Sequence, residues 1–282
     1  MNDIIQKIRD FIRENSNGDP QKFISFLSSL FGDTGSDAPS ENFSILKSKA
    51  EEGDPEIQCC LGFCYENGIG IPEDKTEAVN WYLKAAEQGL AKAQHNLGVS
   101  YAKGVGVPED MAKAANWFRK AAEQGLAKAQ HNLGLCYSCG EGVPEDKAEA
   151  ANWYRKAAEQ GDSGAQFDIA FCYANGCGVP EDKTEAANWY RKAAEQGDAW
   201  AQYLLGVCYA CGDGVPEDMA EAANWYRKAA EQGLAAAQYS LGICCEEGTG
   251  VPKDKTEAIN WYRKAAAQGH KEAAEALKRL SE

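Results

Sequence analysis

The chain has 282 residues, with 43 acidic and 29 basic side chains and a formal net charge of −14. This balance argues against nucleic acid as a partner, because phosphate backbones are bound by clustered lysine and arginine. It fits simple solubility or a preference for basic partners. No run of 18 apolar residues occurs, so no transmembrane segment is expected.

Two amphipathic helices are expected at the N-terminal end. Residues 3–14 and 20–31 each place their apolar side chains on one helical face. We expect residues 1–32 to form a helical hairpin that packs on the structure after it; a separate docking element for a partner is the alternative. No basic start precedes the apolar run at 23–31, so no secretion signal is expected.

A short polar segment connects this hairpin to the rest of the chain. Residues 33–40 are rich in Gly, Asp, Ser and Pro, which is typical of a linker. Residues 41–53 resemble the second half of the repeat that follows, so a degenerate half-repeat is expected there.

Residues 54–269 consist of one sequence motif repeated every 36 residues, in which a tryptophan is followed by Tyr or, once, Phe. Such a period is typical of a solenoid, where each unit buries its apolar face against its neighbours. An array of this kind offers a long shallow surface rather than a deep core for an active site. The six repeats are 54–89, 90–125, 126–161, 162–197, 198–233 and 234–269.

Each repeat contains the signals of two helices. In 198–233 the first helix is expected from about Asp198 to Ala210, before a glycine-rich loop. The second begins near Asp218, and Glu221 three residues later suggests a capping box. It ends at a Gln-Gly step, where glycine adopts a left-handed cap. Residues 270–282 are expected to form a terminal capping helix with a charged outer face, which completes an all-α fold.

Small residues inside the helices indicate close packing. Glycine recurs in the first helices, as at Gly206, although it costs about 1 kcal/mol of helix propensity there. A bulky neighbour is expected over it, and the Trp-Tyr pair is the obvious candidate. The tryptophans are therefore interpreted as structural rather than as a binding stripe.

The cysteines also follow the repeat. Packed helices lie about 8–10 Å apart, whereas a disulfide needs Cα atoms within about 7 Å. Equivalent cysteines should therefore stay as reduced, buried thiols, and a cytoplasmic-type setting is expected, with leaderless export left open. Five of the eleven are spaced at multiples of 36: Cys64, Cys136, Cys172, Cys208 and Cys244.

No cofactor, metal site or catalytic group is expected. Cys136/Cys139 and Cys208/Cys211 have metal-ligand spacing, with Cys177 as a third candidate ligand. A tetrahedral zinc site needs four ligands, and the two pairs lie two repeats apart. The three histidines form no Ser-His-Asp or Cys-His pattern, so the chain is not expected to be an enzyme.

The repeated pattern AQxxLGxxYxxGxGVPEDxxxAxxWYRKAAEQG resembles the Sel-1-like repeat, a relative of the tetratricopeptide repeat. The resemblance covers about three quarters of the chain. It implies an α/α right-handed superhelical solenoid of two-helix repeats and a scaffold or adaptor that binds other proteins.

A cysteine-rich, secreted branch of that family carries a disulfide in each repeat and is associated with binding or hydrolysing β-lactams. This chain has Ala86 and Ala93 where that branch has cysteine. The departure weakens a β-lactam enzyme as an alternative function. A secreted effector that engages host proteins is a second alternative.

Variation between the repeats points to the first helices as the recognition surface. The resemblance implies that these helices line a concave groove, and that a peptide or helix of another protein binds there. The oligomeric state is left open. The candidate protein-binding residues are an aromatic group, Phe167, Trp200, Tyr203 and Tyr239, and a more basic group, Lys92, His95, Lys128 and His131.

Overall fold

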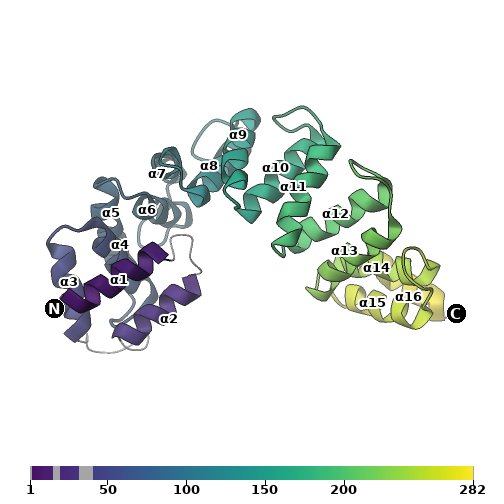
Figure 1. Cartoon of the computed structure of the whole chain (residues 1–282), viewed down its shortest axis with the longest axis horizontal. Coiled ribbons are helices and arrows are strands. Elements are labelled where there is room, and N and C mark those ends of the chain that lie inside the picture. Colours follow the sequence, from purple (N-terminus) through teal and green to yellow (C-terminus); the bar gives the residue numbers. More distant parts are fainter. Residues whose placement is uncertain (1, 15–19, 32–40, 282) are drawn as a thin grey trace. The chain divides into compact units, whose positions relative to one another are not determined.

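A computed structural model describes residues 2–14, 20–31 and 41–281, and the predicted linker at 33–40 lies outside these residues (Figure 1). The described residues form sixteen helices and no strand, which confirms the predicted all-α fold. The helices are α1 (Asn2–Glu14), α2 (Pro20–Phe31), α3 (Glu41–Glu51), α4 (Pro55–Asn67), α5 (Lys75–Glu87), α6 (Ala91–Lys103), α7 (Met111–Glu123), α8 (Ala127–Cys139), α9 (Lys147–Glu159), α10 (Ser163–Asn175), α11 (Lys183–Glu195), α12 (Ala199–Cys211), α13 (Met219–Glu231), α14 (Ala235–Glu247), α15 (Lys255–Ala267) and α16 (Lys271–Ser281).

The chain divides into two compact units, residues 1–145 and 146–282. Within each unit, consecutive helix pairs pack one after another as a repeat solenoid, and every repeat contributes a first and a second helix (Figure 1). None of the described helices has both the length and the apolar character needed to cross a membrane.

Aspartates start the second helices, as the sequence predicts, but the capping box is incomplete. Asp218 accepts hydrogen bonds from the backbone amides of Ala220 and Glu221, at 2.9 and 3.0 Å. The backbone amide of Asp218 donates to the carbonyl of Tyr209 in the preceding helix, at 2.9 Å. The prediction that this amide donates to the side chain of Glu221 is therefore wrong. The aspartate thus caps its own helix through its side chain and joins the two helices of the repeat through its backbone.

The second helices end at the predicted Gln-Gly step. Gly161 follows α9 with φ of 93°, a left-handed conformation that favours glycine. The amide of the next residue, Asp162, donates back to Ala157, and the side chain of Asp162 then caps α10. One turn therefore ends one repeat and begins the next.

The aromatic residue after the tryptophan, rather than the tryptophan itself, fills the space over the first-helix glycine in four repeats, at Gly62, Gly98, Gly206 and Gly242. A Cβ atom added at Gly206 would lie 2.6 Å from the ring of Tyr226, and one at Gly242 would lie 2.5 Å from Tyr262. Phe118 takes this place over Gly98. Glycine fits these four positions because an aromatic ring lies directly against the first helix, whereas repeat 4 has Ala170 at the equivalent position.

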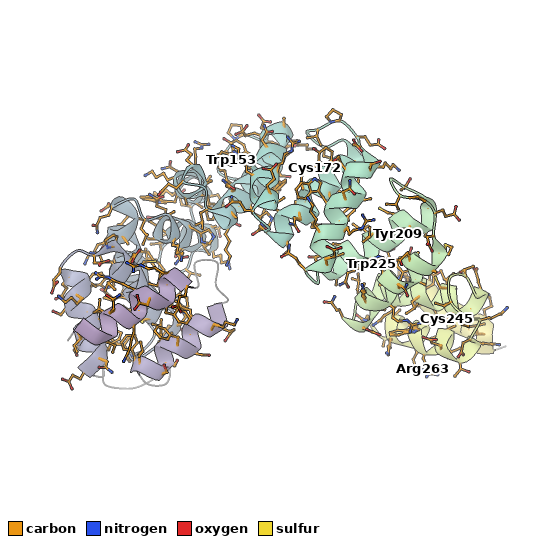
Figure 2. The ribbon with its side chains drawn as sticks, in the orientation of Figure 1. Trp153, Cys172, Tyr209, Trp225, Cys245 and Arg263 are labelled. Carbon is orange, nitrogen blue, oxygen red and sulfur yellow. The ribbon has the colours of Figure 1, made fainter. Side chains whose placement is uncertain are left out.

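The six tryptophans pack differently from the sequence-based interpretation. Five are buried and Trp117 is half-buried, and in every repeat a lysine three residues later lies with its Nζ 3.6 to 4.0 Å from the indole centroid. Trp225, labelled in Figure 2, is 9% exposed, and Nζ of Lys228 lies 3.6 Å from its ring centroid. The ammonium covers the outer indole face through a cation–π contact, while the rest of the ring is buried in the stack.

A ladder of buried glutamines connects successive repeats. Gln202 Nε2 donates to the carbonyl of Ala194 in the preceding second helix, at 3.1 Å. Its Oε1 accepts from Nε2 of Gln232, at 2.9 Å, and Gln232 also donates to the carbonyl of Gly197. Because Gln202 is only 5% exposed, these bonds satisfy a polar group that would otherwise destabilise the interior. Gln94, Gln166 and Gln238 make equivalent bonds.

Both ends of the described array are covered by additional helices. Ile8 of α1 and Leu27 of α2 are fully buried in the same core as Ile57 and Leu61 of the first repeat. At the other end, α16 buries Ala273 and Ala276 against the last repeat.

Candidate functional site

The aromatic candidates of the second unit lie on its first helices and are partly buried, and the ring of Tyr239 also stacks on His270, with centroids 4.6 Å apart. We call the equivalent positions Cys59, His95, His131, Phe167, Tyr203 and Tyr239 the 59 column. Phe167, Tyr203 and Tyr239 are half-buried, and each ring centroid lies 5.7 to 5.8 Å from the tyrosine ring of the second helix in its own repeat. This column therefore both supports the repeat and reaches its surface.

Trp200 differs from every other tryptophan in the chain. It lies in the first turn of α12, at a position where the other repeats have Glu, Lys, Gly or Ala, and it is 53% exposed. Its ring meets Tyr203 edge-on, with centroids 6.2 Å apart. The contact holds the indole against the helix while leaving more than half of its surface to solvent.

The candidates expected to form a more basic group differ in their exposure. Lys128 is exposed and Lys92 half-buried, but burial lowers the pKa of His95 from its ordinary value. Nε2 of His95 accepts a hydrogen bond from the side-chain Nδ2 of Asn132, at 3.1 Å. Nδ1 of His95 lies 3.3 Å from Oδ1 of Asn96. These contacts fit a neutral imidazole, and burial disfavours the charged form. His131 is half-buried.

The sequence interpretation missed a second column on the same helices. The 63 column comprises Phe63, Val99, Leu135, Phe171, Val207 and Ile243. Leu135 is 40% exposed and Phe171 is 49% exposed, the largest exposed hydrophobic side chains beside Trp200. The column lies four residues after the 59 column, which places both on one helical face. All six members are apolar, a pattern typical of core, and the offset of four from the 59 column is the signal in the sequence that relates the two.

The second unit carries a group of aromatic side chains on its first helices, which we call the aromatic face. It consists of Phe167, Phe171, Trp200, Tyr203 and Tyr239. They come from three successive first helices, α10, α12 and α14. Exposed aromatic and apolar side chains of this kind are typical anchors of protein interfaces, since they bury a large area with few rotatable bonds. The arrangement offers apolar contact and no charged catalytic group.

The cysteines give no metal centre among the described residues. All eleven are free thiols, and no group of three or more His, Cys, Asp or Glu side chains that could hold a metal ion is found in this part of the chain. Cys172 on α10 and Cys245 on α14 are buried, and burial raises the pKa of each thiol to about 11 (Figure 2). These thiols are protonated at neutral pH and pack as small apolar groups. Cys139 and Cys211 are exposed.

Comparison with solved structures gives close relatives of this architecture. A protective antigen present in uropathogenic Escherichia coli strains, which displays an SLR fold, shares 36% identity over 97% of this chain with a TM-score of 0.84. This chain spans only 59% of that protein's length. A Sel1 repeat protein from Oxalobacter formigenes shares 37% identity over 98% of this chain and 80% of its own, with a TM-score of 0.75. No curated protein matches the chain.

The family model for the Sel1 repeat matches six consecutive segments: 58–90, 91–126, 127–162, 163–198, 201–234 and 235–270. These segments cover most of the chain, and they follow the same 36-residue phase as the Trp-Tyr pairs. The chain belongs to the Sel1 repeat family.

Proposed function

We propose that this protein is a non-enzymatic scaffold that binds a peptide or helical segment of another protein on the aromatic face. The observation that carries the proposal is the exposure of Trp200 and Phe171, 53% and 49%, on adjacent first helices of the repeat series. Sel1 repeat solenoids are generally protein-interaction scaffolds, which agrees with this use of the surface.

The cost of exposing these side chains supports a binding role. An apolar side chain left in water forfeits about 25 cal/mol per Å² of surface that burial would otherwise gain. In the second helices five of the six recurrent tryptophans are buried, which shows that this architecture is able to bury an indole. The stacking of the repeats therefore does not require the exposed indole of Trp200.

The support beneath the exposed rings also favours binding. Tyr203 packs on Tyr226, and Phe167 packs on Tyr190, so the half-buried rings form a fixed base for the exposed ones. Groups held in place before binding lose less conformational entropy when a partner docks. A helix or extended peptide would thus meet a pre-arranged apolar surface.

Site-specific photo-crosslinking in the native cell tests the proposal. A photoreactive residue in place of Phe171 is expected to crosslink a defined partner, identified by mass spectrometry. The same residue in place of Asn188, exposed on the second helix α11, is the matched control and should not capture that partner.

The double variant Trp200→Ala/Tyr203→Ala then supplies the decisive comparison. We expect the crosslink from position 171 to fall by roughly tenfold or more, as for the loss of aromatic interface anchors. Circular dichroism must show unchanged helicity. An undiminished crosslink in a folded double variant would disprove binding at the aromatic face.

A further inference from the structure

Trp200 is the one tryptophan that has no lysine or arginine over its ring among the residues that the structure describes. Each of the six second-helix indoles has a lysine three residues later, with Nζ 3.6 to 4.0 Å from the ring centroid. The residue three after Trp200 is Tyr203, which meets the indole edge-on. The chain therefore covers every recurrent indole with a cation and leaves the one exposed indole without it.

The first helices of the second unit supply no such cation. The sequences of α10, α12 and α14 contain neither lysine nor arginine. Their acidic residues are Asp168, Glu246 and Glu247. Acidic groups without basic ones attract positively charged partners through long-range electrostatics. The charge of these helices therefore favours a cation that comes from another protein.

A carboxylate lies two residues before Trp200, at the start of the same helix. Oδ1 of Asp198 accepts from the amide of Ala201, at 2.7 Å, and so caps α12. The other oxygen, Oδ2, accepts no hydrogen bond from residues 146–281. The N-terminus of a helix is the positive end of its dipole and would repel a cation, and the charge of Asp198 offsets this effect.

The first repeat shows how an aspartate at this position binds an arginine. Asp54 stands at the place of Asp198, and its Oδ1 likewise accepts from the amides of Glu56 and Ile57, at 3.0 and 3.2 Å. Oδ2 of Asp54 accepts from Nη2 of Arg9 in α1. One carboxylate therefore caps a first helix through one oxygen and binds a guanidinium through the other.

Repeat 5, residues 198–233, is the one repeat that has both an aspartate at this position and an aromatic ring two residues later. Asp54 and Asp162 are followed at that distance by Glu56 and Gly164, and the other three repeats start with leucine. The combination is therefore not a consequence of the repeat pattern, which five repeats keep without it.

We propose that the partner segment on the aromatic face presents an arginine, whose guanidinium stacks on the open face of Trp200 and pairs with Oδ2 of Asp198. This inference rests on the proposed function and names the side chain that the partner must supply. Arginine fits better than lysine, because a planar guanidinium stacks on an aromatic ring and donates to a carboxylate at the same time.

A random library of short peptides displayed on phage supplies the probe. The library is selected on the full-length chain, after removal of the peptides that also bind the chain with Trp200→Ala. We expect the remaining peptides to be enriched in arginine beside apolar residues. Fluorescence anisotropy then gives the Kd of the tightest peptide, which should rise with added salt because an ion pair contributes.

A fluorinated indole tests the cation–π contact itself. Fluorine withdraws electron density from the ring face that attracts a cation and leaves the shape of the ring almost unchanged. Trp200→tetrafluorotryptophan should therefore weaken binding of the arginine peptide by about fivefold or more. A peptide with citrulline, the neutral analogue, in place of arginine should bind both proteins with similar affinity, since the interaction is already absent.

An asparagine variant tests the carboxylate. Asp198→Asn keeps the helix cap and removes the charge, so it should weaken binding of the arginine peptide by about threefold to tenfold. Asp218→Asn makes the same change at the cap of the second helix in the same repeat, and this matched control should leave the affinity unchanged.

Several outcomes would overturn the inference. They are a library in which no peptide depends on Trp200, Trp200-dependent peptides without arginine, and equal binding of the arginine peptide by the native and the fluorinated protein. Self-association of the full chain that disappears in Trp200→Ala would make the occupant a second copy rather than a partner protein. If the cellular crosslink from position 171 depends on Trp200 but the peptides show no preference for arginine, only this inference fails and the proposed function stands.

Discussion

Two tryptophans of a single repeat, Trp225 and Trp200, show how differently the first and second helices use one residue type. Trp225 lies on the second helix, 9% exposed, with the Lys228 ammonium 3.6 Å from its ring. Trp200 lies on the first helix, 53% exposed, and contacts Tyr203 at its edge. The indole that recurs every 36 residues builds the stack, whereas the one that occurs once remains available to a partner.

This division has a physical origin in the stacking itself. The second helices are held by aromatic rings over first-helix glycines, as at Tyr226, by the glutamine ladder and by bonds to the next repeat, such as that from Arg191 to Tyr209, at 2.8 Å. A substitution at any of these positions disturbs two repeats. The first helices carry the exposed large hydrophobic side chains of the described residues, Leu135, Phe171 and Trp200, so these positions vary without loss of the fold.

Removal of the recurrent indole should have the largest effect on stability. Trp225→Ala empties a buried ring site and is expected to lower the free energy of unfolding by about 3–5 kcal/mol. Urea denaturation followed by circular dichroism measures the change. A loss below about 1 kcal/mol would contradict the structural role assigned to the second-helix tryptophans.

Gly178, in the loop between the two helices of repeat 4, should be the next most sensitive position. Gly178 has φ of 73°, and an added Cβ would lie 1.9 Å from the carbonyl oxygen of Lys147. Gly178→Ala therefore combines left-handed backbone strain with displacement of a neighbouring backbone, for about 2–4 kcal/mol of destabilisation.

Gly161→Ala, at the step between two repeats, is the matched control for Gly178→Ala. Its φ of 93° is also positive, but nothing lies within 4 Å of the added Cβ, so only the strain of about 1–2 kcal/mol remains. Equal losses for the two variants, measured by the same denaturation, would show that the close approach at Gly178 contributes nothing.

The glutamine ladder predicts an intermediate effect. Gln202→Ala leaves the carbonyl of Ala194 and the amide of Gln232 without their buried partner, for about 1–3 kcal/mol. Gln232→Ala removes an exposed side chain from the same ladder and should cost less. The reverse order in thermal or urea unfolding would mean that burial does not set the strength of these bonds.

Much of the fold could be predicted because one pattern is repeated six times. Period, two helices per repeat, the aspartate caps and the Gln-Gly ends follow from local chemistry. The partner of the Asp218 amide could not be predicted, because it is a carbonyl in a different helix, that of Tyr209. The same limit explains why the ring over Gly206 is Tyr226 rather than Trp225: only packing in three dimensions decides which of two adjacent aromatics faces the first helix.

The candidate site could be predicted only in part. Trp200 stands out in the sequence because it is unique in its column. Phe171 does not, because an apolar residue at every member of the 63 column suggests core, and exposure depends on whether another helix covers it. At Phe63 one does, through Phe23, and at Phe171 none of the described residues does so to the same extent.

The smallest effect on stability is expected where the effect on binding is largest. Trp200→Ala removes an indole that is 53% exposed and contacts mainly Tyr203, so the free energy of unfolding should change by less than about 0.5 kcal/mol. Beside Trp225→Ala, it compares the same substitution in two helices of one repeat. A loss for Trp200→Ala that approaches the loss for Trp225→Ala would mean that the first-helix indole also holds the stack. If Trp200→Ala leaves the free energy of unfolding unchanged but reduces crosslinking from position 171, a loss of structure cannot explain the loss of the partner. Recognition and folding would then depend on different residues of one 36-residue repeat.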